Sequence, residues 1–362
     1  MQHFGMAAFA GGAPVNSGFA VMKGVDGVPL LVMKTQPTAS DVHVNTPLTM
    51  ISVAYIQNET RFVASRVFPN IPVSKQSDLY FEFDRGFMNR SEMVVRAPGT
   101  ETRGIGYKVD SSANYYCNVY GLHHDVADAV RANADAPLNP DRNATQLLTL
   151  QGLLTKELKF VNNYFKASVW TYDRTGVASA PGTNQFLQWN DAASTPIEDI
   201  RLYKRTIAES TGFEPNKLVL GRAVWDALLD HPDIVDRIKG GATTGQPAVA
   251  SMNLMAQLFE IEEVLVANAI QNTAAEGQTA SHSFIAGKGA LLCYSAPQPG
   301  VEVPSAGYTF SWNGLMGASA FGTRISRFRM EHLKSDRIEI EAAFDMKKTG
   351  ADLGCFLATA VA

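Results

Sequence analysis

The side chains that could do chemistry are spread thinly along the chain, and the histidines are the clearest case. His123 and His124 are adjacent, so their side chains diverge on a helix or a strand, and neither has the partner four residues away that a metal pair on a helix needs. His231 lies at the end of an expected helix, where the imidazole can satisfy terminal carbonyl groups. His282 and His332 stand alone. These positions predict structural or solvated histidines and no metal site.

Short motifs that approach nucleophile and phosphate sites each lack a required residue. GASAFG at 317–322 approaches a nucleophile elbow, but Phe321 occupies the place of the second glycine. GIGYKV at 104–109 has no third glycine, and AGKGA at 286–290 lacks the spacing and the Ser or Thr of a P-loop. No carboxylate pair stands out for acid–base work. The sequence therefore predicts no catalytic residue and no cofactor-binding residue, and we do not expect an enzyme.

Composition narrows the class of protein further. The 362 residues carry a formal net charge of only −4, so no strong field recruits nucleic acid or an anionic membrane. Cys117, Cys293 and Cys355 are odd in number and far apart, which argues against a disulfide framework and predicts buried thiols in a reducing compartment. No apolar run approaches the roughly 20 residues of a membrane span, and no segment reads as a targeting signal. We expect a soluble chain that is not exported.

Helices and short apolar strands alternate through much of the second half. Leucines and aromatic residues at steps of three and four predict a helix over 141–165, capped by Asp141 and about 37 Å long at 1.5 Å per residue. A helix capped by Ser194 or Thr195 and ended by Gly212 follows it, and then a buried strand, KLVLG. This alternation of helices and short apolar strands predicts an α/β domain over roughly 190–300. We also expect a short helix over 122–133 and a turn-rich loop over 171–195.

The stretch RFRMEHLKSDRIEIE predicts an antiparallel hairpin with one wet face and one buried face, packed against the long helix. One register matches charges and apolar residues at the same time. In that register the opposing pairs are Arg327 with Glu341, Arg329 with Glu339, Glu331 with Arg337, Phe328 with Ile340 and Met330 with Ile338.

Two regions of the chain cannot form a hydrophobic core of their own. Residues 1–60 have few charges and no persistent helical or strand period, which suits an arm laid on another surface. Apolar and polar residues alternate over 79–84 and 105–110, which predicts two strands that form the arms of one hairpin. The long charged connection between them has too few apolar residues to build a core. Mixed signs suit a complementary protein surface better than a polyanion. The predicted intersubunit contacts are Arg85, Arg90, Glu92, Arg96, Glu101 and Arg103.

Several recurrent phrases from about Thr46 to the C-terminus resemble one family. They read MISVAYIQNETRFVASRVFPNIPVSKQSDLYFEFDRG, RAPGTETRGIGYKV, HHDVADAVRANADAPLNPDRNATQLLTLQGLLTKE, KLVLGRAVWDALLDHPDI and SDRIEIEAAFDMKKTGADLGCFLATAV. Through them the chain resembles a major capsid protein of a tailed bacteriophage, with the α+β Hong Kong 97-like fold. Residues 1–45 match nothing in that family.

The resemblance implies a domain order. The expected parts are an N-terminal arm at 1–60, an extended loop and its base at 61–120 with the hairpin at about 75–110, a spine helix and part of a peripheral domain at 121–190, an axial α/β domain at 191–305, a peripheral-domain β-hairpin at 306–348, and a C-terminal strand that returns to the axial domain at 349–362.

The resemblance also implies a function. Copies of the chain would form hexamers and pentamers that close into an icosahedral head around double-stranded DNA, which the shell holds without reading its sequence. A portal, a separate scaffolding protein and a decoration protein are the implied partners, with assembly in the host cytoplasm, no membrane and no cofactor. Some relatives cross-link a loop lysine to a neighbour's asparagine, and Lys75 and Lys108 are the candidates here.

Two other classes of protein stay open at this point. An encapsulin-like compartment shares the implied fold but encloses protein cargo, and a soluble enzyme could use the α/β segment as its catalytic domain. A neighbouring gene for a portal or for a ferritin-like cargo would separate the first from a phage head, and an isolated monomer in solution would favour the second.

Overall fold

The fold is described from a computed structural model. The described residues are 19–23, 29–33, 57–80, 82–83, 91–104, 109–110, 113–134, 139–241, 251–300, 303–316 and 323–362. Contacts divide the chain into two compact units. Unit 1 comprises Met1–Ile56, His123–Leu148 and Ile325–Glu339, and unit 2 comprises Gln57–Leu122, Thr149–Arg324 and Ile340–Ala362.

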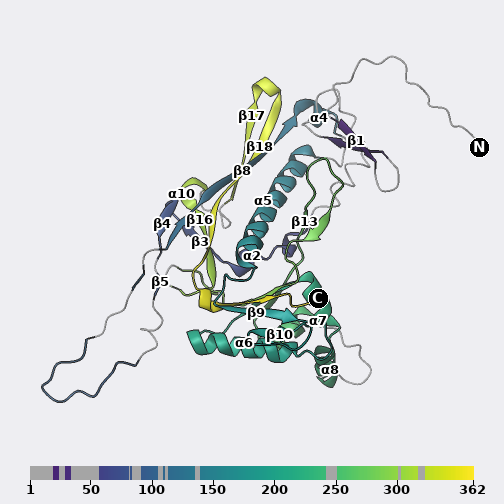
Figure 1. The fold of residues 1–362 in the computed structure, drawn as a ribbon. Coiled ribbons are helices and arrows are strands. Elements are labelled where there is room, and N and C mark those ends of the chain that lie inside the picture. The colour runs from purple at the N-terminus through teal and green to yellow at the C-terminus, as the bar shows by residue number, and fades with distance from the viewer. Residues whose placement is uncertain are drawn as a thin grey trace, which may run out of the picture. The chain divides into compact units, whose positions relative to one another are not determined.

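A six-stranded sheet organises unit 2, with the strand order β10-β9-β19-β15-β11-β12 (Figure 1). The bounds are β9 Tyr172–Val177, β10 Gln185–Leu187, β11 Lys217–Gly221, β12 Glu263–Ala267, β15 Ala290–Cys293 and β19 Gly354–Ala358. The pairs β11–β12, β19–β9 and β10–β9 are parallel, whereas β15 runs antiparallel to both β11 and β19. KLVLG therefore forms the buried strand that the sequence predicts, as β11.

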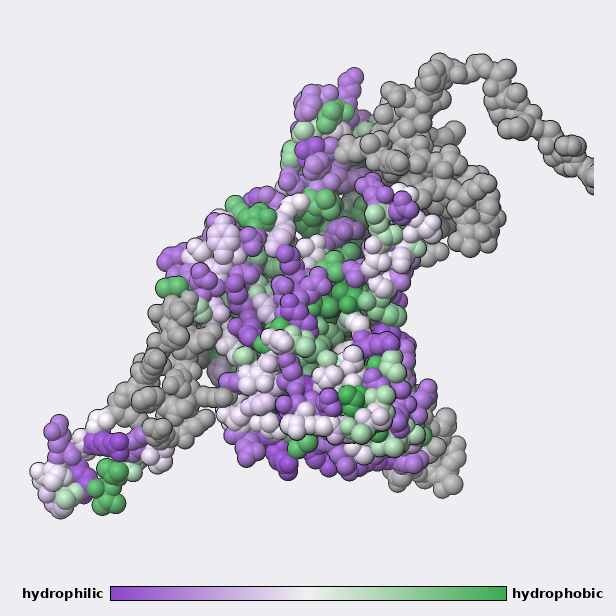
Figure 2. Space-filling model, viewed as in Figure 1, coloured by the Kyte–Doolittle hydropathy of each residue, from purple (hydrophilic) through white to green (hydrophobic). Residues whose placement is uncertain are grey.

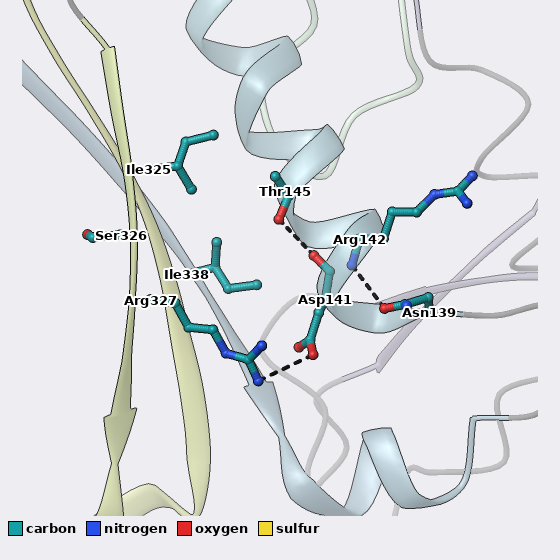
Figure 3. Close-up of a pocket in the computed structure, with 8 residues that line it drawn as sticks. All are labelled: Asn139, Asp141, Arg142, Thr145, Ile325, Ser326, Arg327 and Ile338. Carbon is teal, nitrogen blue, oxygen red and sulfur yellow. Dashed lines mark hydrogen bonds and ion pairs between the residues drawn. The ribbon is translucent and has the colours of Figure 1, made fainter. Parts of the chain in front are cut away.

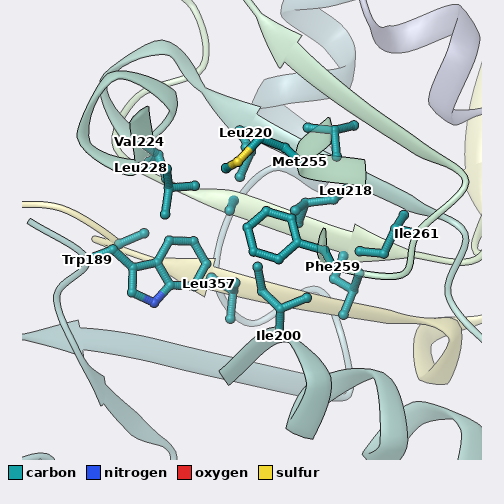
Figure 4. Close-up of a cluster of buried hydrophobic side chains, with 14 of the residues drawn as sticks. Trp189, Ile200, Leu218, Leu220, Val224, Leu228, Met255, Phe259, Ile261 and Leu357 are labelled. Atoms are coloured by element: carbon teal, nitrogen blue, oxygen red, sulfur yellow. The ribbon is translucent and has the colours of Figure 1, made fainter. Parts of the chain in front are cut away.

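Both faces of this sheet are buried, which explains why its central strands are apolar almost without interruption. Leu218 and Leu220 of β11 point into one core, and Val219 between them points into the other. Four helices pack on the first face, and Figure 4 shows the side chains that meet there. These helices are α6 Pro196–Thr211, α7 Arg222–Leu229, α8 Pro232–Gly241 and α9 Met252–Leu258.

The long helix α5, Pro140–Tyr164, confirms the helix predicted over 141–165. Its C-terminal half contributes Phe160 and Val161 to the second core, together with the short helix α2, Ala64–Val67. Its cap differs from the prediction, because Asn139 Oδ1 accepts from the backbone N–H of Arg142 at 3.1 Å. Asp141 lies in the first turn instead, since Pro140 takes the first helical position.

A second sheet contains β3 Asn70–Val73, β16 Gly307–Trp312, β18 Ser335–Lys348 and β17 Thr323–Met330, and β8 Asn118–Ala127 also pairs with β18. The helix predicted over 122–133 is therefore wrong in its first half, and only α4, Asp128–Ala132, is helical. Val126 and Val130 have helical spacing, but pairing with β18 extends the chain through Ala127. Tertiary context overrides local spacing here.

β9 and β10 lie in the segment 171–195 that the sequence predicts as a turn-rich loop, so that prediction is wrong for these two strands and confirmed for 178–184 and 188–195. The two strands lie at one edge of the six-stranded sheet, where polar residues are tolerated. Gly176 of β9 is needed there, because a Cβ would lie 2.2 Å from the carbonyl oxygen of Thr359. The N-terminal region also holds an unpredicted antiparallel pair, β1 Phe19–Lys23 and β2 Pro29–Met33.

β17 and β18 form the predicted hairpin, but the predicted ion pairs are wrong. A 3-10 turn spans Glu331–Leu333, and Lys334 takes a left-handed conformation at φ 46°. Glu331 therefore belongs to the turn rather than to the strand. Glu341 binds Arg324 at 2.5 Å instead of Arg327.

The predicted buried face of this hairpin is confirmed for β18 and wrong for Phe328 of β17. Ile338 and Ile340 of β18 are buried, at 3% and 6% exposure, while Phe328 of β17 is 42% exposed. A Cβ on Gly152 would lie 3.3 Å from Ile340 Cδ1, so β18 packs on α5 as expected.

The remaining elements are short. They are β4 Ser77–Leu79, β5 Glu82–Phe83, β6 Val109–Asp110, β7 Asn114–Tyr116, β13 Ile270–Asn272, β14 His282–Phe284, α10 Asn313–Met316, and 3-10 turns at Glu59–Arg61 and Ala351–Leu353.

Candidate functional site

The base of the extended loop is anchored on unit 2. β4 pairs with β7, and beyond them Glu82 pairs with Asp110 and Phe83 with Val109. The predicted pairing is thus confirmed for 82–83 with 109–110, whereas Leu79 pairs with Asn114 beyond the predicted arm, and 105–108 lie outside the described residues. Below the arms, the ring centroids of Tyr80 and Tyr115 lie 5.7 Å and 4.6 Å from that of Phe310. This stack fixes the root of the loop.

The far part of the loop makes few contacts with its own chain. Met93 and Val95 are fully exposed, at 97% and 101%, and Val94 is 62% exposed. Figure 2 shows hydrophobic side chains gathered at the end of this loop. Consecutive exposed apolar residues on an extended loop mark a surface for another molecule. The signal was present in the sequence as MVV, between the charged residues that the prediction emphasised.

The predicted contact residues do not act as one group. Glu92 binds Arg103 at 2.9 Å, which ties the two sides of the loop together. Arg96 and Glu101 are exposed, while Arg85 and Arg90 lie outside the described residues.

Of the two lysines proposed from the resemblance, only Lys75 lies among the described residues. Lys75 donates to Asp78 Oδ2 at 3.0 Å, and this bond is the largest cause that lowers the pKa of Asp78. Lys108 lies outside the described residues.

Unit 1 is held by a network of ion pairs near the turn of the β17–β18 hairpin. Arg131 binds Asp141 at 2.8 Å and Asp336 at 2.9 Å, and Arg329 reaches Asp128 at 2.6 Å. Arg329 therefore pairs with Asp128 and not with Glu339 as predicted. The guanidinium of Arg329 is the largest cause that lowers the pKa of Asp128.

A shallow cavity of about 380 Å³ lies beside this network, between the start of α5 and β17 (Figure 3). Ile325 and Ile338 line one side and Asn139 and Arg142 the other. Arg337, which the sequence paired with Glu331, instead forms two bonds to the buried Asp125 at 2.7 and 2.8 Å.

One pair of side chains has the types of a nucleophile and its base. Ser194 Oγ lies 2.9 Å from His231 Nε2, and both residues are buried. The backbone N–H of Asp233 donates to His231 Nδ1 at 3.2 Å, so the proton of a neutral ring is on Nε2. His231 thus caps the start of α8 rather than the end of α7 as predicted, and Ser194 has no base beside it.

The cysteines and acidic residues offer no reactive centre among the described residues. All three cysteines are free and buried, as predicted, and burial raises the pKa of the Cys117, Cys293 and Cys355 thiols to about 12. Within the described ranges no three His, Cys, Asp or Glu side chains come together as metal ligands. No helix in the described part of the chain is long and apolar enough to span a membrane.

Comparison with known proteins gives one consistent picture. The family described as phage major capsid protein E matches residues 185–306. A major capsid protein of Pseudomonas phage JBD67 is 28% identical over 317 residues, which cover 87% of this chain and 96% of that protein.

Two solved structures share the fold. A phage-related protein of Bordetella bronchiseptica RB50 matches with a TM-score of 0.63 at 21% identity, covering 88% of this chain and 97% of that one. A capsid chain of cyanophage P-SCSP1u matches with a TM-score of 0.53 at 11% identity, covering 91% and 96%.

Proposed function

We infer that this chain is a major capsid protein of a tailed phage with the Hong Kong 97-like fold, and that its copies assemble into the closed icosahedral shell of the virion. It is a structural protein rather than an enzyme. The sequence relatives support this reading, because they are phage capsid proteins. An encapsulin-like compartment has the same fold, so the fold does not separate the two.

The observation that carries the assembly proposal is the extended loop. Its base is fixed by the stacked rings on Phe310, while Met93 and Val95 are fully exposed and Val94 is mostly exposed. We propose that this apolar tip docks on a neighbouring copy, with Arg96 and Glu101 at the rim. Many such modest contacts between copies would let misplaced subunits dissociate during assembly.

Other parts of the proposal come from the family. Residues 1–45 would lie as an arm on neighbouring copies, and the chain would divide into peripheral and axial domains. Double-stranded DNA would fill the shell without sequence-specific contacts. A portal, a separate scaffolding protein and a decoration protein would complete the head, assembled in the host cytoplasm. Lys75 and Lys108 stay candidates for a cross-link.

The tip can be tested by replacing Met93, Val94 and Val95 with serine. We expect the variant to melt as the parent protein does, because these side chains are mostly exposed and lie outside the cores. Electron microscopy and sedimentation should show free subunits or small oligomers instead of closed shells. The matched control Val95→Ile keeps the tip apolar and should assemble. Normal shells from the serine variant would exclude the tip as an assembly contact.

A further inference from the structure

Glu157 is a carboxyl group enclosed in the second core of unit 2. It lies in α5 with 0% exposure, next to Phe160 and against Val63 and Ala64 at the start of α2. The backbone N–H groups of Val63 and Ala64 donate to its Oε2 at 3.0 and 2.9 Å. These two bonds fasten residues 62–67 to the C-terminal half of α5.

The other oxygen of this carboxyl group, Oε1, is buried and has no hydrogen-bond partner. A charged carboxylate in this position would have one buried oxygen without a protein donor, which is costly. A proton on Oε1 removes that charge and leaves Oε2 free to accept both N–H groups. Burial is the largest cause that raises the pKa of Glu157 to about 7, against the lowering effect of the two bonds.

The charged side chains on the elements packed around Glu157 have partners of their own. They are Arg66 of α2, Lys217 of β11, Glu263 of β12, and Lys156 and Lys159 of α5. Arg66 and Lys217 both bind Glu263. The two lysines of α5 lie over the rings of Phe344 and Tyr120, at 5.2 and 5.5 Å. Protonation is therefore the means by which this carboxyl group loses its charge.

We propose that Glu157 is a protonation-controlled latch that holds residues 62–67 on α5. The neutral carboxyl group fits the closed core and keeps both bonds. The ionised group gains by leaving the core for water, which releases the start of α2. Because the pKa is raised in the closed state, closure is strongest in acid and weakens as the pH rises toward the folded pKa.

A second contact of the same segment does not titrate. The side-chain amide of Gln57 donates to the carbonyl oxygen of Ile270 at 2.8 Å, and Gln57 Oε1 accepts from the backbone N–H of Ile270 at 2.9 Å. Gln57 thus holds the start of this segment through contacts that do not depend on pH, besides the bonds of Val63 and Ala64 to Glu157. Opening the latch would loosen residues 62–67 while Gln57 stays on β13.

Amide hydrogen exchange of Val63 and Ala64 in the full-length chain tests the latch. After correction for the intrinsic rate, we expect protection to fall about tenfold for each pH unit between about pH 5 and about pH 7, and to level off above that. Glu157→Gln cannot ionise, so its protection should not change with pH. The matched control Glu209→Gln removes an exposed carboxyl group from α6 and should keep the parent profile.

Two results would overturn the proposal: flat protection in the parent protein, or the same fall in Glu157→Gln. Infrared spectroscopy of the parent protein covers the case in which the glutamine variant does not fold. A protonated-carboxyl band should be present at about pH 6 and absent at about pH 8.5. Absence of that band at about pH 6 would equally refute the latch.

Discussion

Replacing Lys156 with methionine should stabilise the protein near neutral pH. Lys156 is 4% exposed in α5, and burial lowers the pKa of its ammonium group from 10.5 to about 8. That difference corresponds to about 3 kcal/mol of destabilisation at pH 7. Losing the contacts of the ammonium group, among them the one with the ring of Phe344, costs about 1–2 kcal/mol. A methionine of similar length can pack on the same ring. We expect a net gain of about 1–2 kcal/mol.

The pH dependence distinguishes this cause from better packing. The folded pKa of Lys156 lies below its unfolded value, so the parent protein regains stability as the pH rises from about 8 to about 10.5. The advantage of Lys156→Met should therefore shrink over that interval. Urea unfolding of the unassembled chain at several pH values measures it, with exposed Lys166→Met as the control. A variant that is less stable at pH 7, or whose gain persists unchanged at about pH 10.5, would refute the reasoning.

Two further substitutions test the packing of unit 2. Phe160 is fully buried with its ring edge-on to Phe68, so Phe160→Ala should lower the free energy of unfolding by about 3–5 kcal/mol in urea titrations, and Phe160→Leu by less than about 1.5 kcal/mol. Equal losses would contradict this packing. Gly176→Ala should lower it by about 1–3 kcal/mol, because the new Cβ meets the backbone of Thr359, whereas Gly182→Ala meets only a flexible glutamine and should change little.

The parts of the fold that could be predicted are those in which local pattern and burial agree. The apolar stripe of α5 and the apolar run of β11 each match the period of the element they form. β8 shows the opposite case, since Val126 and Val130 have helical spacing but a neighbouring strand decides the conformation. β9 and β10 carry no apolar period, because they lie at a sheet edge whose existence depends on the distant strand β19.

The ion pairs of the β17–β18 hairpin show why charge matching alone is a weak guide to register. Arg329 binds Asp128 and Asp336, and Arg337 binds Asp125. Asp128 and Asp125 lie outside the hairpin. The turn geometry at Lys334, and not the charges, sets which residues face each other. The Glu157 contact was equally beyond prediction, because it joins residues more than ninety positions apart.

The place of β19 in its sheet has a consequence for protein synthesis. β19 pairs with β15 on one side and β9 on the other, and its Phe356 and Leu357 enter opposite cores. A ribosome delivers the other strands of this sheet well before Ala358, so a nascent chain leaves a slot between β9 and β15. A polypeptide cut short before β19 would keep that slot open and expose both cores. Synthesis must therefore pass β19 before this sheet can close, and subunits terminated upstream of β19 would be left to proteolysis instead of entering the particle.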